Sequence, residues 1–480
     1  MEEITRGLTS KTRHSSSVLQ AMTSLHTKIR TGSEEEKEAG IKVLWTQLGN
    51  PDSVLVCRAS ADLLAGLVRS GDLEPGATIT QLLACLSQGM EYCGLIPALG
   101  SSLCLQAEAA IARSGGRYPD LYSISSKQHP FVSVLRSTPA AWSLVSDECL
   151  HILDHPVEVI KQNRIAILKP ILLYLFCDPN YHLHFGAMRS ILLDTLLYLA
   201  KEDRDVLSFL MNMLGWMKLD NKNSLKETST FIYKMFDWCE AEKDLHNLTS
   251  LAHILPSLAL YQVKYGYSAV KSLKQLDSLL DMDGVTDISW DAVMVVLQAV
   301  LDTAPHTSHG PILRLAMRIM PRVTRVTAGM MVVTCLQSLP LPAHLPGHQV
   351  ELKADLIRLF HKTPWTDTMS SPPPVPVILL DSSMREAMET VKIISSISRS
   401  ASDCESWLTG LTCVSHSQLT VNYPLLTSVF LCPQSSASGQ AALKLLLQCV
   451  KADPSLSTPF LSLILHKLAT DNKVQTAYIR

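Results

Sequence analysis

The sequence has few charged and few aromatic residues for its length. Charged residues make up 18% of the 480 positions and aromatic residues 6%, whereas hydrophobic residues make up 47%. Globular domains usually carry about 25% charged residues, and disordered chains combine low hydrophobicity with high net charge. The composition therefore excludes disorder over most of the chain. The scarcity of aromatic side chains favours cores of Leu and Ala, as in stacked helices.

The sequence also lacks a block of one charge. Its formal net charge is −2, with no basic cluster and no acidic tail. Proteins that grip DNA or RNA concentrate Lys and Arg to neutralise phosphates. We therefore predict no direct contact with nucleic acid.

Signals for secretion or membrane insertion are weak. Residues 1–17 lack the apolar core of a signal peptide, which indicates a cytosolic start. A membrane helix needs about 20 largely apolar residues. The most apolar stretches contain proline, charged or polar residues, and we interpret them as buried helices: 165–177, 191–200, 326–341 and 419–432. A multi-pass membrane protein built from the uncharged helices after residue 250 stays open as an alternative.

No cysteine pair has the Cys-x-x-Cys spacing of a metal or redox site. Several of the twelve cysteines fall in apolar helical stretches: Cys57, Cys85, Cys104, Cys177, Cys335 and Cys449. Isolated apolar cysteines are typical of reduced, buried thiols in a cytosolic protein. We favour this interpretation over disulfides or zinc ligation.

Catalytic signatures are missing as well. The sequence contains no G-x-x-x-x-G-K-[ST], G-x-G-x-x-G, G-x-S-x-G or H-E-x-x-H motif. We therefore predict a protein that is not an enzyme, and assign it no catalytic residue, cofactor or metal. A cryptic enzyme that uses Asp178, His182 or His184 is the competing hypothesis.

Three groups of polar residues resemble metal sites only superficially. His182 and His184, near Cys177 and Asp178, have a spacing that points two rings in different directions on a helix. His151 and His155 are four residues apart and could share a helix face, but Pro156 ends that helix. Asp281 and Asp283 lack the terminal glutamate of a calcium loop. We interpret these residues as surface and turn positions.

Amphipathic helices, by contrast, fill most of the chain. The stretch 50–68 predicts a proline turn and then a helix, with Asp52 or Ser53 as its cap and apolar residues every three to four positions. Similar turns precede helices at 178–179, 303–305 and 453–454. Two of the three intervals, 128 and 126 residues between prolines, fit about three units of ~42 residues. This pattern resembles the HEAT repeat and predicts an all-α, HEAT/armadillo-like α-solenoid.

Composition shifts divide the predicted solenoid. We expect a tail and first helix at 1–32, HEAT-like repeats at 33–363, a Pro-rich linker at 364–377 and continuing repeats at 378–480. Because the last residues lack a polar capping helix, we expect the sequence to be the start of a longer protein. The linker is interpreted as a stiff loop, with a docking site for a Pro-recognising domain as the alternative.

An aromatic cluster is denser than the rest of the sequence. It comprises Phe209, Trp216, Phe231, Tyr233, Phe236 and Trp238. Core packing between helices is the favoured interpretation, and a groove for a partner is the alternative.

Three segments, in order and approximate spacing, resemble the N-terminal region of the focadhesin family of helical-repeat proteins. They are 121–142 (LYSI, then HP, VL, Pro139 and Trp142), 170–179 (PILLYLFCDP) and 402–408 with the helices that follow. The resemblance implies a non-enzymatic scaffold in the cytoplasm, associated with focal adhesions and vinculin and with the Ski complex that feeds RNA to the exosome. A generic HEAT-repeat trafficking adaptor is the alternative.

Overall fold

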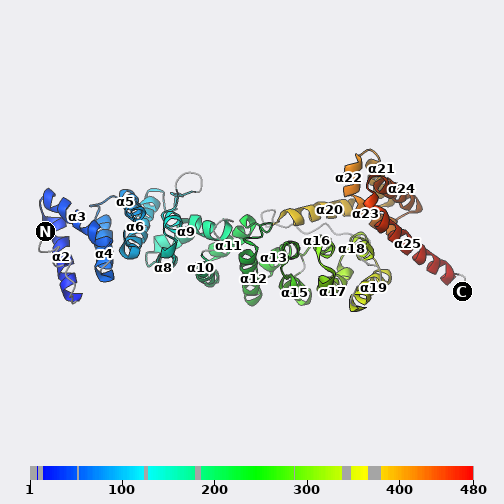
Figure 1. Ribbon diagram of the computed structural model, residues 1–480, viewed down its shortest axis with the longest axis horizontal. Helices are drawn as coiled ribbons and strands as arrows, with labels where there is room; N and C mark the ends of the chain where they lie inside the picture. The colour runs from blue at the N-terminus through cyan, green and yellow to red at the C-terminus, as the bar shows by residue number, and fades with distance from the viewer. Residues whose placement is uncertain are drawn as a thin grey trace. The chain divides into compact units, whose positions relative to one another are not determined.

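The computed structural model of the protein is built from α-helices. It describes residue 8 and residues 15–50, 53–123, 128–178, 185–285, 287–337, 347–365 and 380–478. Over these ranges the chain forms helices joined by turns and contains no β-strand (Figure 1). The predicted all-α class is confirmed at this level. Most of the predicted Pro-rich linker and both His182 and His184 lie outside the described residues.

The chain divides into two compact units, Met1–Met213 and Leu214–Arg480. The helices of the first unit are α2 (Ser15–Thr31), α3 (Glu34–Leu48), α4 (Val54–Ser70), α5 (Pro75–Ser87), α6 (Tyr92–Arg113), α7 (Pro130–Ser137), α8 (Trp142–Leu153), α9 (Glu158–Cys177) and α10 (Gly186–Leu199). Helix α11 (Arg204–Trp216) contains the boundary between the units.

The helices of the second unit follow after α11. They are α12 (Leu225–Ala241), α13 (Leu245–Ala252), α14 (Leu255–Lys264), α15 (Val270–Ser278), α16 (Trp290–Thr303), α17 (His309–Ile319), α18 (Arg325–Gln337), α19 (Gly347–Lys362), α20 (Ser382–Arg399), α21 (Ala401–Leu411), α22 (His416–Val421), α23 (Tyr423–Leu431), α24 (Ser436–Ala452) and α25 (Ser457–Tyr478).

Local sequence explains where the first helices begin and end. Ser33 and Glu36 form a capping box at the start of α3, in which each side chain accepts a hydrogen bond from the other residue's backbone N–H. Ser53 caps α4 through the Val56 N–H, as predicted for one of the two candidate positions. Gly71 ends α4 with a φ of 84°, a conformation that favours glycine.

Helices of the first unit pack mainly on helices close to them in the sequence. Helix α4 contacts α2, α3 and α6, and α6 in turn contacts α5, α8 and α9. At the junction of α3, α4 and α6 the backbones come close together at Gly94. A Cβ atom there would lie 2.5 Å from the Leu48 carbonyl oxygen and 2.8 Å from that of Cys57. Only glycine fits this contact without movement of the backbone.

The second unit begins in the same way and then folds back. Helices α14 to α19 contact near neighbours, but α20 packs against α14, α16 and α18. Helices α23 and α25 also contact α18. The buried Ser428 hydroxyl of α23 donates a hydrogen bond of 2.6 Å to the Val326 carbonyl of α18. The end of the chain therefore covers helices that precede it by about a hundred residues.

Prolines account for the main differences from the predicted helix bounds. The apolar pattern over 243–264 predicts one helix, but the structure forms two, α13 and α14, and Pro256 occupies the first turn of the second. Pro424 occupies the same position in α23, which separates it from α22. Proline lacks an N–H group, so it is tolerated in a first turn where that donor has no helical partner. Pro130 likewise opens α7, a helix that the sequence analysis missed.

Candidate functional site

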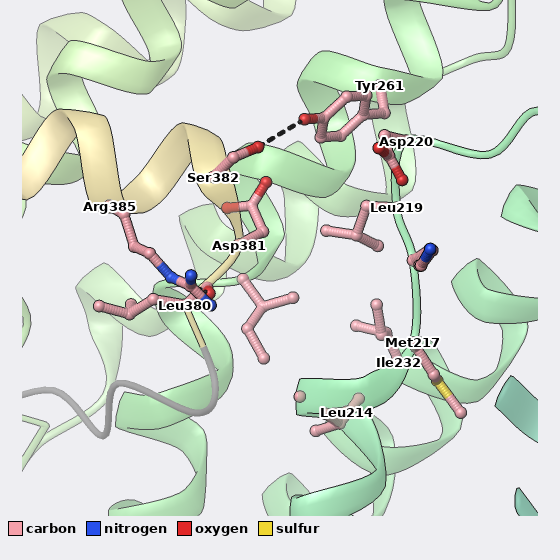
Figure 2. Close-up of a pocket in the computed structure, with 13 residues that line it drawn as sticks. Leu214, Met217, Leu219, Asp220, Ile232, Tyr261, Leu380, Asp381, Ser382 and Arg385 are labelled. Atoms are coloured by element: carbon pink, nitrogen blue, oxygen red, sulfur yellow. Dashed lines mark hydrogen bonds between the residues drawn. The ribbon is translucent and has the colours of Figure 1, made fainter.

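A cleft of about 210 Å³ lies beside the N-terminus of α20, within the second unit (Figure 2). Its walls come from the end of α11, the segment after it, α12, α14 and the start of α20. The lining residues are Leu214, Gly215, Met217, Lys218, Leu219, Asp220, Ile232, Ile254, Tyr261, Leu380, Asp381, Ser382 and Arg385.

Helix α14 holds two walls of the cleft through three hydroxyl groups. Ser257, Tyr261 and Tyr265 are four residues apart, so they lie on one helix face. The Ser257 hydroxyl donates to Asp381 Oδ1 at 2.5 Å, and the hydroxyls of Tyr261 and Ser382 are 3.2 Å apart. The Tyr265 hydroxyl donates to the carbonyl oxygen of Asp220 on the facing wall. One helix thus positions both the segment after α11 and the start of α20.

Asp381 is the central polar group of the cleft. It is the N-cap of α20, and its Oδ1 accepts from the Met384 N–H at 3.0 Å as well as from Ser257. Its other oxygen, Oδ2, is buried and has no hydrogen-bond partner among the residues that the structure describes. Buried polar atoms are normally paired, so this oxygen is an exception in the described part of the chain.

The charges around the cleft balance, and the walls between them are apolar. Lys218 and Arg385 contribute two positive charges, and Asp220 and Asp381 two negative ones. The Arg385 Nε–H donates to the Leu380 carbonyl at 2.9 Å. Neither histidine nor cysteine occurs among the lining residues. A few polar groups on apolar walls suit the binding of a small group such as one peptide side chain.

The sequence analysis missed this site. Its local signals were the four-residue spacing of hydroxyl side chains in 257–265 and the Asp-Ser-Ser start of α20. Neither signal indicates that the two segments meet across 124 residues.

The polar residues weighed as metal ligands have structural partners where the structure describes them. Burial raises the pKa of Cys177 to about 12, so its thiol stays protonated. The His155 Nδ1 accepts from the Val157 N–H at 3.2 Å, and its ring meets that of His151 edge to face. Asp281 pairs with Arg318. Within the described ranges, no group of three or more His, Cys, Asp or Glu residues could hold a metal ion.

The aromatic cluster is largely core. Phe209, Phe231 and Phe236 are 8%, 2% and 1% exposed, which confirms the core-packing interpretation for these rings. The Tyr233 hydroxyl joins a buried network with Gln262 and Ser272. Trp216 differs, because 41% of its surface is exposed.

One described helix, α6, is long and apolar enough to cross a membrane by length and composition. The structure buries 61% of its most apolar window against other helices. A core helix of this length is buried in the same way. Among the described helices after residue 250, none is both long and apolar enough to cross a membrane.

The part of the chain that the structure describes is all-helical, and its second unit contains a cleft lined by apolar and charged residues. No family model matches the chain. The sequence is similar to curated proteins named focadhesin, and it is focadhesin-like. The identity is 22% over 293 residues with the mouse protein, 24% over 303 residues with the zebrafish protein and 26% over 157 residues with the human protein.

These matches cover part of each protein. The mouse and zebrafish alignments each include 59% of this chain, but only 16% and 17% of the relatives. The human alignment includes 33% of this chain and 9% of the relative. The aligned part thus spans about a sixth of the mouse and zebrafish proteins.

Proposed function

We propose that the protein is a non-enzymatic α-solenoid scaffold of HEAT-like repeats that binds other proteins. The observation that carries the proposal is the order of helix contacts in the first unit. There α4 packs between α2, α3 and α6, and α6 between α4, α5 and α8, so that each helix is covered by near neighbours in the sequence. Repeat proteins of this kind present extended surfaces to partners. Similarity to focadhesin over more than half of the chain supports the same class.

The cleft at α20 is the proposed contact point within this scaffold. Its occupant is a partner side chain with an apolar stem and an N–H donor at its end, such as Lys or Arg. The stem packs on Leu219, Ile232 and Leu380, and its charged end pairs with the Asp381 carboxylate. A charge-assisted hydrogen bond of this kind is about twice as strong as a neutral one.

The resemblance to focadhesin leads us to propose two partners, vinculin and the subunits of the Ski complex. A cytoplasmic location with access to focal adhesions accompanies this proposal. The chain aligns with about a sixth of the mouse and zebrafish relatives. We therefore also propose that this aligned region is a part of the protein that binds these partners.

Affinity purification of the full chain, followed by mass spectrometry, tests the function and the cleft together. Asp381→Asn keeps the capping oxygen but replaces the unpaired acceptor with a donor. Asp283→Asn is the matched control, because it removes the same charge from an exposed turn. We expect the wild type and Asp283→Asn to recover Ski subunits or vinculin, and Asp381→Asn to lose them.

Two results would contradict these proposals separately. Recovery of neither partner by the wild type would reject the partner assignment. Equal recovery by all three proteins would leave the scaffold in place but remove the cleft from its binding surface.

A further inference from the structure

Two histidines from distant segments meet at the surface of the second unit. His361 lies in the last turn of α19, and His466 lies in α25, 105 residues later. Their Nε2 atoms are 3.3 Å apart, and their ring centres are 5.4 Å apart with a tilt of 33°. The rings therefore point their Nε2 atoms toward each other.

This spacing matches two ligands of one tetrahedral metal ion. With a zinc–nitrogen bond of about 2.05 Å, two ligand nitrogens at a tetrahedral angle lie about 3.3 Å apart and their ring centres about 5.2 Å apart. The observed separations of 3.3 Å and 5.4 Å agree with both values. In the structure the two Nε2 atoms are also within hydrogen-bond distance, so without an ion one ring can donate to the other.

Contacts beside the two histidines fix the helices that carry them. Phe360 is buried, and its ring meets that of His361 edge to face at 5.2 Å. The Trp365 indole N–H donates to the Phe360 carbonyl at 3.1 Å, which ties down the end of α19. On α25, Leu463 is 1% exposed and Lys467 donates to the Leu431 carbonyl at 3.3 Å. Ligands held by such supporting contacts bind metal more tightly than free side chains.

We propose that His361 and His466 form a site for one divalent transition-metal ion of the zinc type, which links α19 to α25. Imidazole nitrogen is a preferred ligand for zinc, copper and nickel. His361 is exposed and His466 half-buried, so an ion from solution can reach the pair, and water would complete its coordination. The site is separate from the cleft at α20 and does not depend on it.

A bound ion would have a mechanical effect on the end of the protein. The ion would link two residues that are 105 positions apart in the chain. A link across a long loop removes much conformational freedom from the unfolded chain, and so it favours the folded arrangement. Helix α25 exposes Leu461, Leu465 and Leu468 by 58%, 58% and 53%, so few apolar contacts cover that face. The ion would therefore hold a weakly covered helix in place.

Zinc titration of the full chain tests the site. The wild type, His361→Asn and His466→Asn are titrated calorimetrically with zinc chloride, and amide hydrogen exchange in α25 is followed with and without zinc. His151→Asn is the matched control, since it removes an exposed histidine that also contacts another histidine. The control is needed because the sequence contains 16 histidines, and zinc can bind to others among them.

We expect one zinc ion to bind the wild type and His151→Asn equally and to slow exchange in α25. Removing either histidine should weaken zinc binding at least about tenfold. Loss of a residue that only hydrogen-bonds to a ligand already weakens metal affinity by about 10-fold or more, and these histidines would bind the ion directly. Both ligand variants should also lose the zinc-dependent protection of α25. The proposal is wrong if either ligand variant binds like the control, or if zinc leaves exchange in α25 of the wild type unchanged.

Discussion

The two units of the protein use their helices differently. In the first, helix contacts follow the order of the chain, as between α4 and α6 or α8 and α9. In the second, α20 returns along α14, α16 and α18. Both proposed binding features occur in the second unit, where the chain folds back and brings together side chains that are more than a hundred residues apart. Ser257 and Asp381 are separated by 124 residues, and the two histidines by 105.

The contacts that join the helices differ accordingly. The first unit brings backbones together at glycine, with Gly94 against the backbone of Leu48 and Cys57. The second unit fastens its returning helices with buried hydroxyls, as in the bonds of Ser257 to Asp381 and Ser428 to Val326. Backbone contacts tolerate no added atom, whereas a hydroxyl can rotate away. The first unit should therefore be the more sensitive to small increases in side-chain volume.

The largest expected effect is that of Gly94→Ala. The new Cβ atom would lie 2.5 Å from a carbonyl oxygen that belongs to the backbone and cannot turn aside. We expect a loss of about 3 kcal/mol, the upper end of over-packing costs. Hydrogen exchange of the α4 and α6 amides in the full chain measures it.

Gly329→Ala in α18 is the counterpart in the second unit. Its Cβ atom would meet the Ser428 Oγ at 2.6 Å, a side-chain atom that can change rotamer. We expect a smaller loss than for Gly94→Ala. An equal or larger loss would contradict the proposed difference between the units.

A pH-dependent effect should follow from Glu148 in α8. Its carboxyl group fills the space beside Gly100, where a Cβ atom would lie 2.0 Å from Oε2. Burial, and then the charge of Asp147, raise the pKa of Glu148 from 4.5 to about 7. The folded state therefore binds more protons than the unfolded state between these two values, and stability falls as pH rises through that interval.

Glu148→Gln tests this dependence. At pH 8 the glutamine variant should be more stable than the wild type by up to roughly 3 kcal/mol, because it buries no charge. At pH 4 both side chains are neutral and the two proteins should be equally stable. Urea denaturation of both proteins at matched pH measures the difference, and a gain that is the same at both pH values would disprove its electrostatic origin.

Asp381 supplies a fourth prediction, which concerns how α20 is held in the second unit. Asp381→Ala removes the cap of α20 and the bond from Ser257. Loss of an N-cap usually costs about 1–2 kcal/mol, and we expect faster exchange of the Met384 amide by the corresponding factor. Asp381→Asn keeps an acceptor oxygen and should stay close to the wild type. Equal exchange in the alanine variant would show that α20 is held by its apolar contacts alone.

Local features of the fold could be predicted from the sequence, and distant contacts could not. The capping box of Ser33 and Glu36 and the bounds of α3 follow from neighbouring residues. The break at Pro256 was missed because the apolar pattern continues across it. The cleft was missed because Asp381 and Ser257 carry no sign of each other in the sequence. His361 and His466 were missed for the same reason, because only histidines close together in the sequence show the spacing of metal ligands.

The smallest expected effect is that of Gly66→Ala in α4, and it should have the opposite sign to Gly94→Ala. No atom lies within 4 Å of a Cβ atom at Gly66, so the added methyl group meets open space. Alanine in a helix interior is more favourable than glycine by about 0.5–1 kcal/mol, because glycine loses more backbone freedom on folding. Hydrogen exchange in α4 should slow accordingly. Gly66 lies in α4 and Gly94 in α6, and these two helices pack against each other. If alanine stabilises the protein at Gly66 and destabilises it at Gly94, close approach of the backbones, and not helix propensity, makes Gly94 necessary. A destabilised Gly66→Ala protein would reject that explanation of packing in the first unit.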